Sequence, residues 1–436
     1  MSTYRTKKKM KILIWGEVKS GGPYDVHQQL DYAKIYGDLE KNYHCNQMNV
    51  GNKVWIQGII SELSTEENEL FFYNPLETWE EINNKYDKII YSAANMLHPC
   101  YTNLIKKVAT IFKNSKIPVY VIAIGTQALH YDELESLVLE TKEPVAEFMD
   151  CIYETGGEIA CRGYFTKEYL DRIASNTAVA TGCPSLFQNG RNLHIEKREE
   201  KLKKIIINGN MSLNEDILYK YPGSVYIDQG EYLGYKYDLN KYDNIKYVAN
   251  LISKMGKENA KFFLNGNIKV FYDMADWHWY IKNQRFDFSF GSRIHGNIMS
   301  ILSGVPAVVC VIDSRVREMA EIFNIPVVDI KEKYDIQAIY NSSEYDDFNR
   351  KFAKLFDQYE EFLKKCGLVK KVNQKNIFWD KELPLNNDIL EEKRKKLLNV
   401  MNNANFKEKL YFSIARKYPR FARIEEIEAI GMVEKY

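Results

Sequence analysis

An arginine and a histidine stand two residues apart in a short segment whose composition is typical of an anion-binding turn. The segment reads Gly291-Ser292-Arg293-Ile294-His295-Gly296 and precedes an apolar stretch. A guanidinium binds the oxygens of carboxylates and phosphates in a planar, forked geometry, and an imidazole exchanges protons near neutral pH because its ordinary pKa is about 6.5. The pair predicts a site that binds an anionic small molecule and moves protons beside it.

The residues around this pair predict the elements that position it. Residues 286–313 are expected to form strand, turn, helix and strand, with Ser292 as the N-cap of the helix and Gly304 as the left-handed residue after its end. Arg293 and His295 then fall in the first helical turn, where a cation costs a few tenths to about 1 kcal/mol beside the helix dipole. A bound phosphate or carboxylate offsets that cost, because free backbone N–H groups also point at it.

A purely structural role for the same two residues is the alternative. Arg293 would then pair with Asp287 or Asp313, and His295 would fill a polar gap in the core. For a single arginine or histidine we would favour that interpretation. Because both occur in one turn, after Gly-Ser and between two apolar strands, we favour the anion site.

Short apolar strands alternate with helical segments along most of the chain, which indicates an α/β fold with parallel sheets. The predicted strands are residues 11–15, 88–92, 118–124, 178–180, 204–207, 224–227, 261–264, 286–290 and 307–312. Ligands of open α/β sheets bind beyond the carboxyl ends of strands. The loops Gly16-Glu17, Ala93-Ala94-Asn95 and Gly125-Thr126-Gln127 are therefore candidate walls of a binding cleft.

The alternation is interrupted once and then stops, which predicts two Rossmann-like domains and a helical extension. Residues 1–195 form the predicted N-terminal domain, 200–340 the C-terminal domain with the anion site, and 341–436 the extension. In the extension, apolar residues recur at steps of four and three, as in an amphipathic helix: Phe348, Phe352, Leu355, Tyr359 and Phe362. A second helix is expected from Asn387 to Asn403, and packing against the body is its expected role.

Composition narrows the class of protein. The 436 residues carry a formal net charge of +1, so no overall field favours nucleic acid. Seven scattered cysteines without a CxxC pair indicate neither a disulfide framework nor a zinc site, and a reducing cytoplasm fits them best. The longest uncharged run, Gly296–Ile312, contains Gly304 and Pro306 and is expected to form a helix, a turn and a strand rather than a membrane span.

At the arginine–histidine segment the sequence resembles the polysaccharide pyruvyl transferase family. The family's hallmark is a G-S-R-hydrophobic-H-G stretch followed by an apolar helix and G-[VIT]-P, here Gly291–Gly296 and Gly304–Pro306. Asp313 with Arg317 and Glu318 is similar to the region after the next strand. Upstream, the segments Cys161–Thr166 and Gly182–Ser185 are similar to the family's mid-chain arginine segment and to the G-x-P that closes the first half. The likeness spans about residues 11–330.

The resemblance implies a fold like that of the two-domain GT-B glycosyltransferases, with two Rossmann-like domains facing a cleft. It implies phosphoenolpyruvate as co-substrate, no cofactor and no metal, and a bacterial glycan or its lipid-linked precursor as acceptor. A lipid-linked acceptor would bring the enzyme to the inner face of the membrane by peripheral association. One departure stands at the first loop, where Gly16–Pro23 replaces the family's usual N-x-G-D-like sequence and puts the acceptor in question. The oligomeric state does not follow from the sequence.

Roles for single residues follow from combining the motif with the chemistry of phosphoenolpyruvate. Arg293 is the first choice for gripping its carboxylate or phosphate, with Arg162 second, and His295 is the expected general acid or base. The donor site is expected to include Gly291, Ser292 and Gly296. His130, after the Gly125-Thr126-Gln127 loop, is a candidate second proton carrier, and an exposed histidine without such a role is an equal alternative.

Two other functions are compatible with the same residues. In a glycosyltransferase of GT-B-like shape, Arg293 and the helix N-terminus would hold the diphosphate of a nucleotide sugar. A non-catalytic family member would keep the anion site for binding a glycan or a metabolite. The presence of both Arg293 and His295 favours an enzyme.

Overall fold

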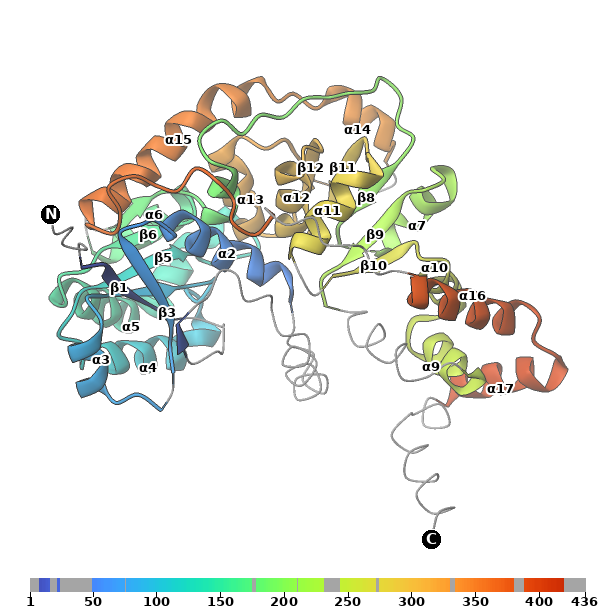
Figure 1. Ribbon diagram of the computed structural model, residues 1–436, viewed down its shortest axis with the longest axis horizontal. Coiled ribbons are helices and arrows are strands. Elements are labelled where there is room, and N and C mark those ends of the chain that lie inside the picture. The colour runs from blue at the N-terminus through green and yellow to red at the C-terminus, as the bar shows by residue number, and fades with distance from the viewer. Residues whose placement is uncertain are drawn as a thin grey trace, which may run out of the picture. The chain divides into compact units, whose positions relative to one another are not determined.

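The computed structural model describes residues 8–15, 22–23, 49–74, 76–174, 178–209, 211–230, 244–271, 274–329, 334–379 and 388–418. Two sheets with helices between their strands make up an α/β fold, and further helices follow toward the C-terminus (Figure 1). The α/β prediction is therefore confirmed.

The first sheet has the strand order β2-β3-β1-β4-β5-β6-β7. All neighbours are parallel except β2 and β3. Every residue of β5 is buried, as expected for a parallel strand covered on both faces.

The strands are β1 (Met10–Trp15), β2 (Gly22–Pro23), β3 (Asn68–Phe72), β4 (Lys88–Ser92), β5 (Val119–Ile124), β6 (Ile159–Cys161) and β7 (Ala178–Ala180). The helices among them are α2 (Gly51–Leu63), α3 (Trp79–Lys85), α4 (Thr102–Phe112), α5 (Leu134–Glu154) and α6 (Tyr164–Ile173), with short 3-10 helices η2 (Pro99–Tyr101), η3 (Tyr131–Glu133) and η4 (Pro184–Asn189).

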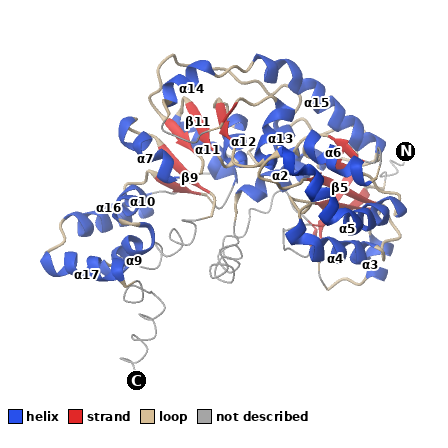
Figure 2. Ribbon diagram, turned by 180° about the vertical axis from the view of Figure 1, so that it is seen from behind, coloured by secondary structure: helices blue, strands red, loops and turns tan. Residues whose placement is uncertain are grey.

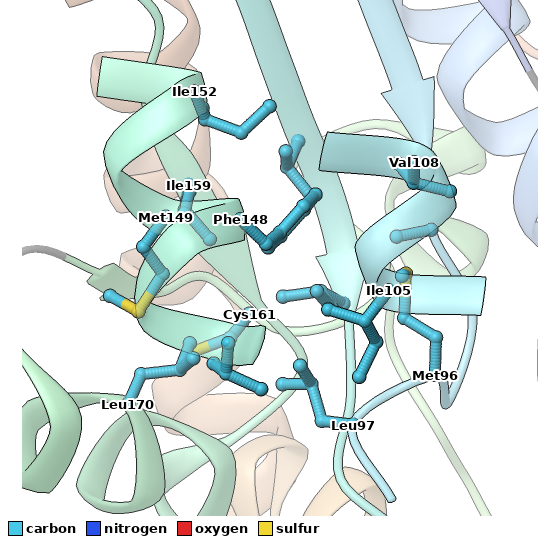
Figure 3. Close-up of a cluster of buried hydrophobic side chains, with 14 of the residues drawn as sticks. Met96, Leu97, Ile105, Val108, Phe148, Met149, Ile152, Ile159, Cys161 and Leu170 are labelled. Atoms are coloured by element: carbon cyan, nitrogen blue, oxygen red, sulfur yellow. The ribbon is translucent and has the colours of Figure 1, made fainter. Parts of the chain in front are cut away.

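A hydrophobic core joins this sheet to α4, α5 and α6. Phe112, Phe148 and Ile152 are fully buried in it, and Met96 and Leu97 close it at the end of β4 (Figure 3). Figure 2 shows α4 and α5 beside β5, as does Figure 1. The core thus fixes the carboxyl ends of β4, β5 and β6.

The second sheet has the strand order β10-β9-β8-β11-β12-β13. Its strands are β8 (Ile205–Ile207), β9 (Val225–Asp228), β10 (Ile268–Val270), β11 (Phe288–Gly291), β12 (Ala307–Cys310) and β13 (Val327–Val328). The accompanying helices are α7 (Met211–Lys220), α9 (Ile245–Met255), α10 (Lys257–Leu264), α11 (Met274–Gln284), α12 (Ile294–Leu302), α13 (Ser314–Phe323) and α14 (Ile336–Ser342).

The chain divides into two compact units. The first contains β1 to β7 and β11 to β13, with α2 to α6, α12 to α14 and α15 (Asp346–Lys365). The second contains β8 to β10, with α7, α9 to α11, α16 (Asp388–Asn402) and α17 (Phe406–Lys417). The boundaries 1–195, 200–340 and 341–436 stay a prediction.

The helices expected near the C-terminus are present. All five apolar residues of the predicted amphipathic pattern are buried in α15 (Asp346–Lys365). The second predicted helix is α16 (Asp388–Asn402), and α17 (Phe406–Lys417) follows it. No helix in the described ranges is both long and apolar enough to cross a bilayer.

One predicted strand is wrong. Lys261–Leu264 forms the end of α10, and the strand at this place is β10, which starts at Ile268. The two are separated by a turn in which Gly266 has a φ of +76°. A short apolar run such as Phe262-Phe263-Leu264 fits either a buried strand or the buried side of a helix end, so periodicity does not separate them. Residues 16–21, the larger part of the unusual first loop, lie outside the described residues.

Candidate functional site

The loops that follow β4, β5, β6 and β7 lie at one edge of the first sheet, because these strands are neighbours and parallel. They carry Asn95, Gly125, Arg162 and Cys183, respectively. Two of these loops were predicted as cleft walls from the sequence. The structure adds Arg162 and Cys183 to the same edge.

Arg162 is the central cation of this edge and is only 3% exposed. Its Nε donates to the backbone oxygen of Ala123 at 2.7 Å, its Nη1 donates to the side-chain oxygen of Asn95, and its guanidinium lies 5.8 Å from the ring centre of Trp55. A guanidinium has five N–H donors, and both of these acceptors are uncharged. Within the described residues no carboxylate lies at ion-pair distance from Arg162. A buried cation of this kind is suited to binding an anion.

The backbone of β5 is irregular at the residues next to Arg162. Ala123, which supplies the accepting oxygen, has a φ of 64°, and the pairing of β5 with β6 shifts between Val121 and Ile124. A non-glycine residue in this conformation costs about 1 to 3 kcal/mol, and such strain often occurs at functional sites. At Gly125 a Cβ atom would lie 3.1 Å from Cδ of Arg162, so the glycine makes room for the arginine.

The arginine–histidine segment forms the predicted junction of β11 and α12, with one correction. The N-cap of α12 is Arg293 and not Ser292, and no side chain caps this helix. The side chain of Asn297 holds the turn by donating to the backbone oxygen of Gly291 at 2.8 Å. This bond fixes the helix start one residue later than the serine pattern predicts. Arg293 is exposed at this terminus, and His295 lies in the first turn as expected.

His295 is buried and faces a thiol. Its Nε2 lies 4.0 Å from Sγ of Cys183, which in turn accepts a hydrogen bond from the hydroxyl of Ser185 at 3.1 Å. Burial, together with the positive charges of Arg162 and Arg315, lowers the pKa of His295 to about 3. The imidazole is therefore neutral at physiological pH in the empty protein.

Arg315, at the junction of β12 and α13, is close enough to His295 and Arg162 for its charge to lower the pKa of both. Its Nε donates to Asp313 at 2.8 Å, and Asp313 also caps α13 by accepting from the backbone of Val316 at 3.0 Å. Ser314 exchanges two hydrogen bonds of 2.9 Å with the backbone of Ala128. The loop after β5 is thereby fixed to the start of α13.

Glu318, one turn further along α13, connects that helix to α6. Its carboxylate accepts from the backbone N–H of Thr166 at 2.9 Å and from the hydroxyl of Thr166 at 2.7 Å. A Cβ at Gly163 would lie 2.9 Å from Glu318, so only glycine permits this approach. Burial raises the pKa of Glu318 to about 7, although the Thr166 bonds and Arg162 act in the opposite direction.

We name Arg162, Cys183, His295, Arg315 and Glu318 the anion cluster. All five belong to the first unit. The cluster combines two guanidinium groups with a neutral imidazole and a carboxyl group whose pKa lies near neutrality. It can bind a ligand that carries carboxylate or phosphate and can exchange protons with it.

The sequence profile of the polysaccharide pyruvyl transferase family matches residues 34–314. The chain belongs to this family. The matched range contains three of the five cluster residues, Arg162, Cys183 and His295, and also Arg293. A comparison with curated proteins gives no match for this pyruvyl transferase family member.

Three of the remaining predicted site residues lie close to His295 in sequence, and no hydrogen bond within the described residues joins the fourth, His130, to the cluster. Gly291, Ser292 and Gly296 are buried at the start of α12. His130 is exposed at the start of η3, where its backbone N–H donates to Glu133 at 3.0 Å. No group of three or more potential ligands in the described part of this family member could hold a metal ion.

Trp55, Cys183 and Arg315 were not predicted as site residues. Arg315 follows a buried strand and opens a helix, which is the pattern that identified Arg293, so the same argument could have found it. Trp55 gives no such signal, because α2 is buried along nearly its whole length and its tryptophan resembles any core residue. Cys183 can be assigned to the site only from its short distance to His295, which lies 112 residues away in the sequence.

Proposed function

We propose that this family member transfers the pyruvyl group of phosphoenolpyruvate onto two hydroxyls of a bacterial surface-glycan sugar, or of its lipid-linked precursor, to form a pyruvate ketal. The observation that supports it best is the buried Arg162, whose two hydrogen-bond acceptors are uncharged. A carboxylate or phosphate of phosphoenolpyruvate would supply the counter-charge. Arg315 and the exposed Arg293 are further candidates for gripping the second anionic group, with Gly291, Ser292 and Gly296 forming the backbone of the donor site.

The reaction requires balanced proton transfers. A proton adds to the methylene carbon, the resulting cationic carbon bonds to a first hydroxyl oxygen, the bond to phosphate breaks, and a second hydroxyl closes the ketal. One hydroxyl proton replaces the proton given to the methylene group, and the other leaves with the phosphate. A group that both gives and takes a proton is therefore needed next to bound phosphoenolpyruvate.

His295 has the properties that this role demands. In the empty protein its pKa is about 3, for the reasons of burial and positive neighbours given above. The negative charges of bound phosphoenolpyruvate raise that pKa, so the imidazole gains a proton when the donor binds. His295 then protonates the methylene carbon and takes the proton of the first hydroxyl. His130 is the proposed second proton carrier.

The other expectations belong to the same proposal. We propose a cytoplasmic location, because the six described cysteines are free thiols, and a role in building the cell envelope. We also propose that the two Rossmann-like domains take the facing arrangement of GT-B enzymes, as the family resemblance implies. An acceptor on a lipid carrier would bring the enzyme to the inner face of the membrane.

Thermal stability against phosphoenolpyruvate and a panel of nucleotide sugars tests the proposal. A ligand that binds only the folded protein raises the melting temperature, by RT ln(1 + [L]/Kd) in free energy. We expect a rise with phosphoenolpyruvate that Arg293→Ala reduces strongly, because the exposed guanidinium at the start of α12 is lost. Arg172→Ala, which removes an exposed arginine paired with Glu135 and Glu168, is the matched control and should keep the rise.

The same panel separates the two alternatives. A rise with nucleotide sugars alone would contradict pyruvyl transfer and favour a glycosyltransferase. A rise with phosphoenolpyruvate without any release of phosphate in the presence of acceptor glycans would favour a non-catalytic family member.

A further inference from the structure

Helix α17 lies on the second unit and has two different faces. Phe412 and Ala415 are buried on the face that packs on α9. Figures 1 and 2 both show α17 next to α9. This face accounts for the attachment of α17 to its unit.

The opposite face of α17 exposes an apolar stripe. Phe406 is 81% exposed, Leu410 51% and Ile414 40%, and Tyr418 continues the series at 45%. Phe406, Leu410 and Ile414 are four apart within α17, and at 3.6 residues per turn each step moves about 40° around the helix, so they form one continuous stripe; Tyr418 follows directly after the helix end at Lys417. Single exposed apolar residues are ordinary, but an aligned series on one helix face is typical of a binding surface.

The charged residues beside the stripe are basic. Lys407, Lys409, Arg416 and Lys417 are all exposed. Glu408 is the one acidic residue in the sequence of α17, and its carboxylate accepts from the backbone N–H of Asn405 at 2.7 Å as part of a capping box. The exposed face of α17 therefore combines apolar side chains with positive charge.

This combination is complementary to an anionic bilayer surface. Apolar side chains of an interfacial helix enter the boundary between headgroups and acyl chains, and lysine and arginine side chains reach the phosphates above it. A protein partner would have to supply an apolar groove lined by acids, and self-association would place the basic residues of two copies together, which is unfavourable.

We propose that the stripe Phe406, Leu410, Ile414 and Tyr418, with its basic neighbours, docks this protein peripherally on membranes that contain anionic phospholipids. The inference does not rest on the proposed reaction, because it concerns a surface of the second unit and a binding event without chemistry. If the proposed reaction holds, docking through this stripe would also bring the enzyme close to a lipid-linked acceptor.

Co-sedimentation of the full chain with vesicles tests the docking surface. Vesicles of phosphatidylcholine mixed with phosphatidylglycerol are compared with vesicles of phosphatidylcholine alone, at low and high salt. We expect binding to the anionic vesicles that falls as salt rises. The double variant Leu410→Ser, Ile414→Ser should bind about tenfold more weakly or worse, and so should Lys409→Glu with Arg416→Glu.

Controls on another helix separate docking from general effects. Leu139→Ser and Lys142→Glu change exposed residues of α5 and should bind as the unchanged protein does. Equal binding to both kinds of vesicle, or unchanged binding by the two α17 double variants, would overturn the proposal. A dimer in solution that Leu410→Ser, Ile414→Ser dissociates would also overturn it, since the stripe would then join two copies.

Discussion

Arg162 and His295 of the anion cluster are buried where their charged forms are disfavoured. His295 is neutral because it is buried beside two arginines, and burial lowers the pKa of Arg162, whose hydrogen-bond acceptors are uncharged. Burying an imidazolium or a guanidinium is costly, and in the empty protein the carboxyl group that acts on Arg162 is Glu318, whose own pKa burial raises to about 7. A bound carboxylate or phosphate would stabilise the charged form of both side chains. The free energy that burial of these groups costs in the empty protein is therefore offset when an anionic ligand binds.

The depressed pKa of His295 predicts how stability depends on pH. The unfolded histidine takes up a proton below pH 6.5, whereas the folded one does so only near pH 3. In this window the unfolded state binds more protons, so the free energy of unfolding falls as the pH falls. Replacing His295 by Gln should remove one titrating group and flatten the decline by about 1.4 kcal/mol per pH unit.

Urea unfolding at a series of pH values measures this slope. His278→Gln is the positive control, because burial also lowers the pKa of His278, to about 4, and its removal should flatten the decline in the same direction. An unchanged slope in His295→Gln, with the expected change in His278→Gln, would show that the imidazole of His295 is already charged in the folded protein.

Local sequence found those residues whose role depends on their own neighbours. Arg293 and His295 could be placed at a helix start because Gly291 and Gly304 mark the turn and the helix end. The error of one residue at the N-cap arose because Asn297, and not Ser292, holds the turn. Cys183 contacts His295, and Glu318 contacts Thr166, because of the order of the strands in the sheets. A local sequence pattern does not contain this order.

At the scale of elements, α2 supports the cluster from the side. Trp55 on this helix lies against the guanidinium of Arg162. One turn later α2 meets η4, where a Cβ at Gly58 would lie 2.5 Å from the backbone oxygen of Pro184. The glycine therefore sets how closely α2 approaches the loop that carries Cys183, and it sets the position of Trp55.

Gly58→Ala should destabilise the protein, although alanine is normally better than glycine in a helix by about 0.5 to 1 kcal/mol. The added methyl group meets backbone atoms of Pro184, which cannot rotate away, so we expect a net loss of about 1 to 3 kcal/mol. We also expect weaker binding of phosphoenolpyruvate, because Trp55 shifts away from Arg162. Urea unfolding and ligand titration measure the two effects.

Gly256→Ala is the matched control for this substitution. Gly256 has a φ of +80° but no atom within 4 Å of the position of a Cβ, so its replacement carries only the backbone cost and should leave ligand binding unchanged. A Gly58→Ala protein at least as stable as the original would contradict the packing argument.

Elements with strong periodicity were predictable, and short or uniformly buried ones were not. The α15 pattern was found because its polar and apolar residues alternate with the helical period. The strand β6 has three residues, and α2 is buried on nearly all sides, so neither shows a period. The misassigned segment 261–264 shares this cause, since a run of three apolar residues carries no period of its own.

At the scale of the whole molecule, the cluster is a product of topology. Its members come from the ends of β6 and β7 and from the starts of α12 and α13, which are separated by up to about a third of the chain and are joined in one unit. The range that the family profile matches, residues 34–314, contains the ends of β6 and β7 and the start of α12. We infer that these residues converge to bind phosphoenolpyruvate.

Calorimetric titration of phosphoenolpyruvate into the full chain tests this claim most directly, with Arg162→Gln and the surface control Arg172→Gln alongside. The account predicts binding accompanied by proton uptake, since the ligand raises the pKa of His295, and loss of binding in Arg162→Gln while the empty variant stays folded or becomes more stable. If Arg162→Gln does not fold, Arg293→Ala, an exposed change, carries the same test. Binding by Arg162→Gln and Arg293→Ala as tight as that of the unchanged protein, or no binding by the unchanged protein, would contradict the account.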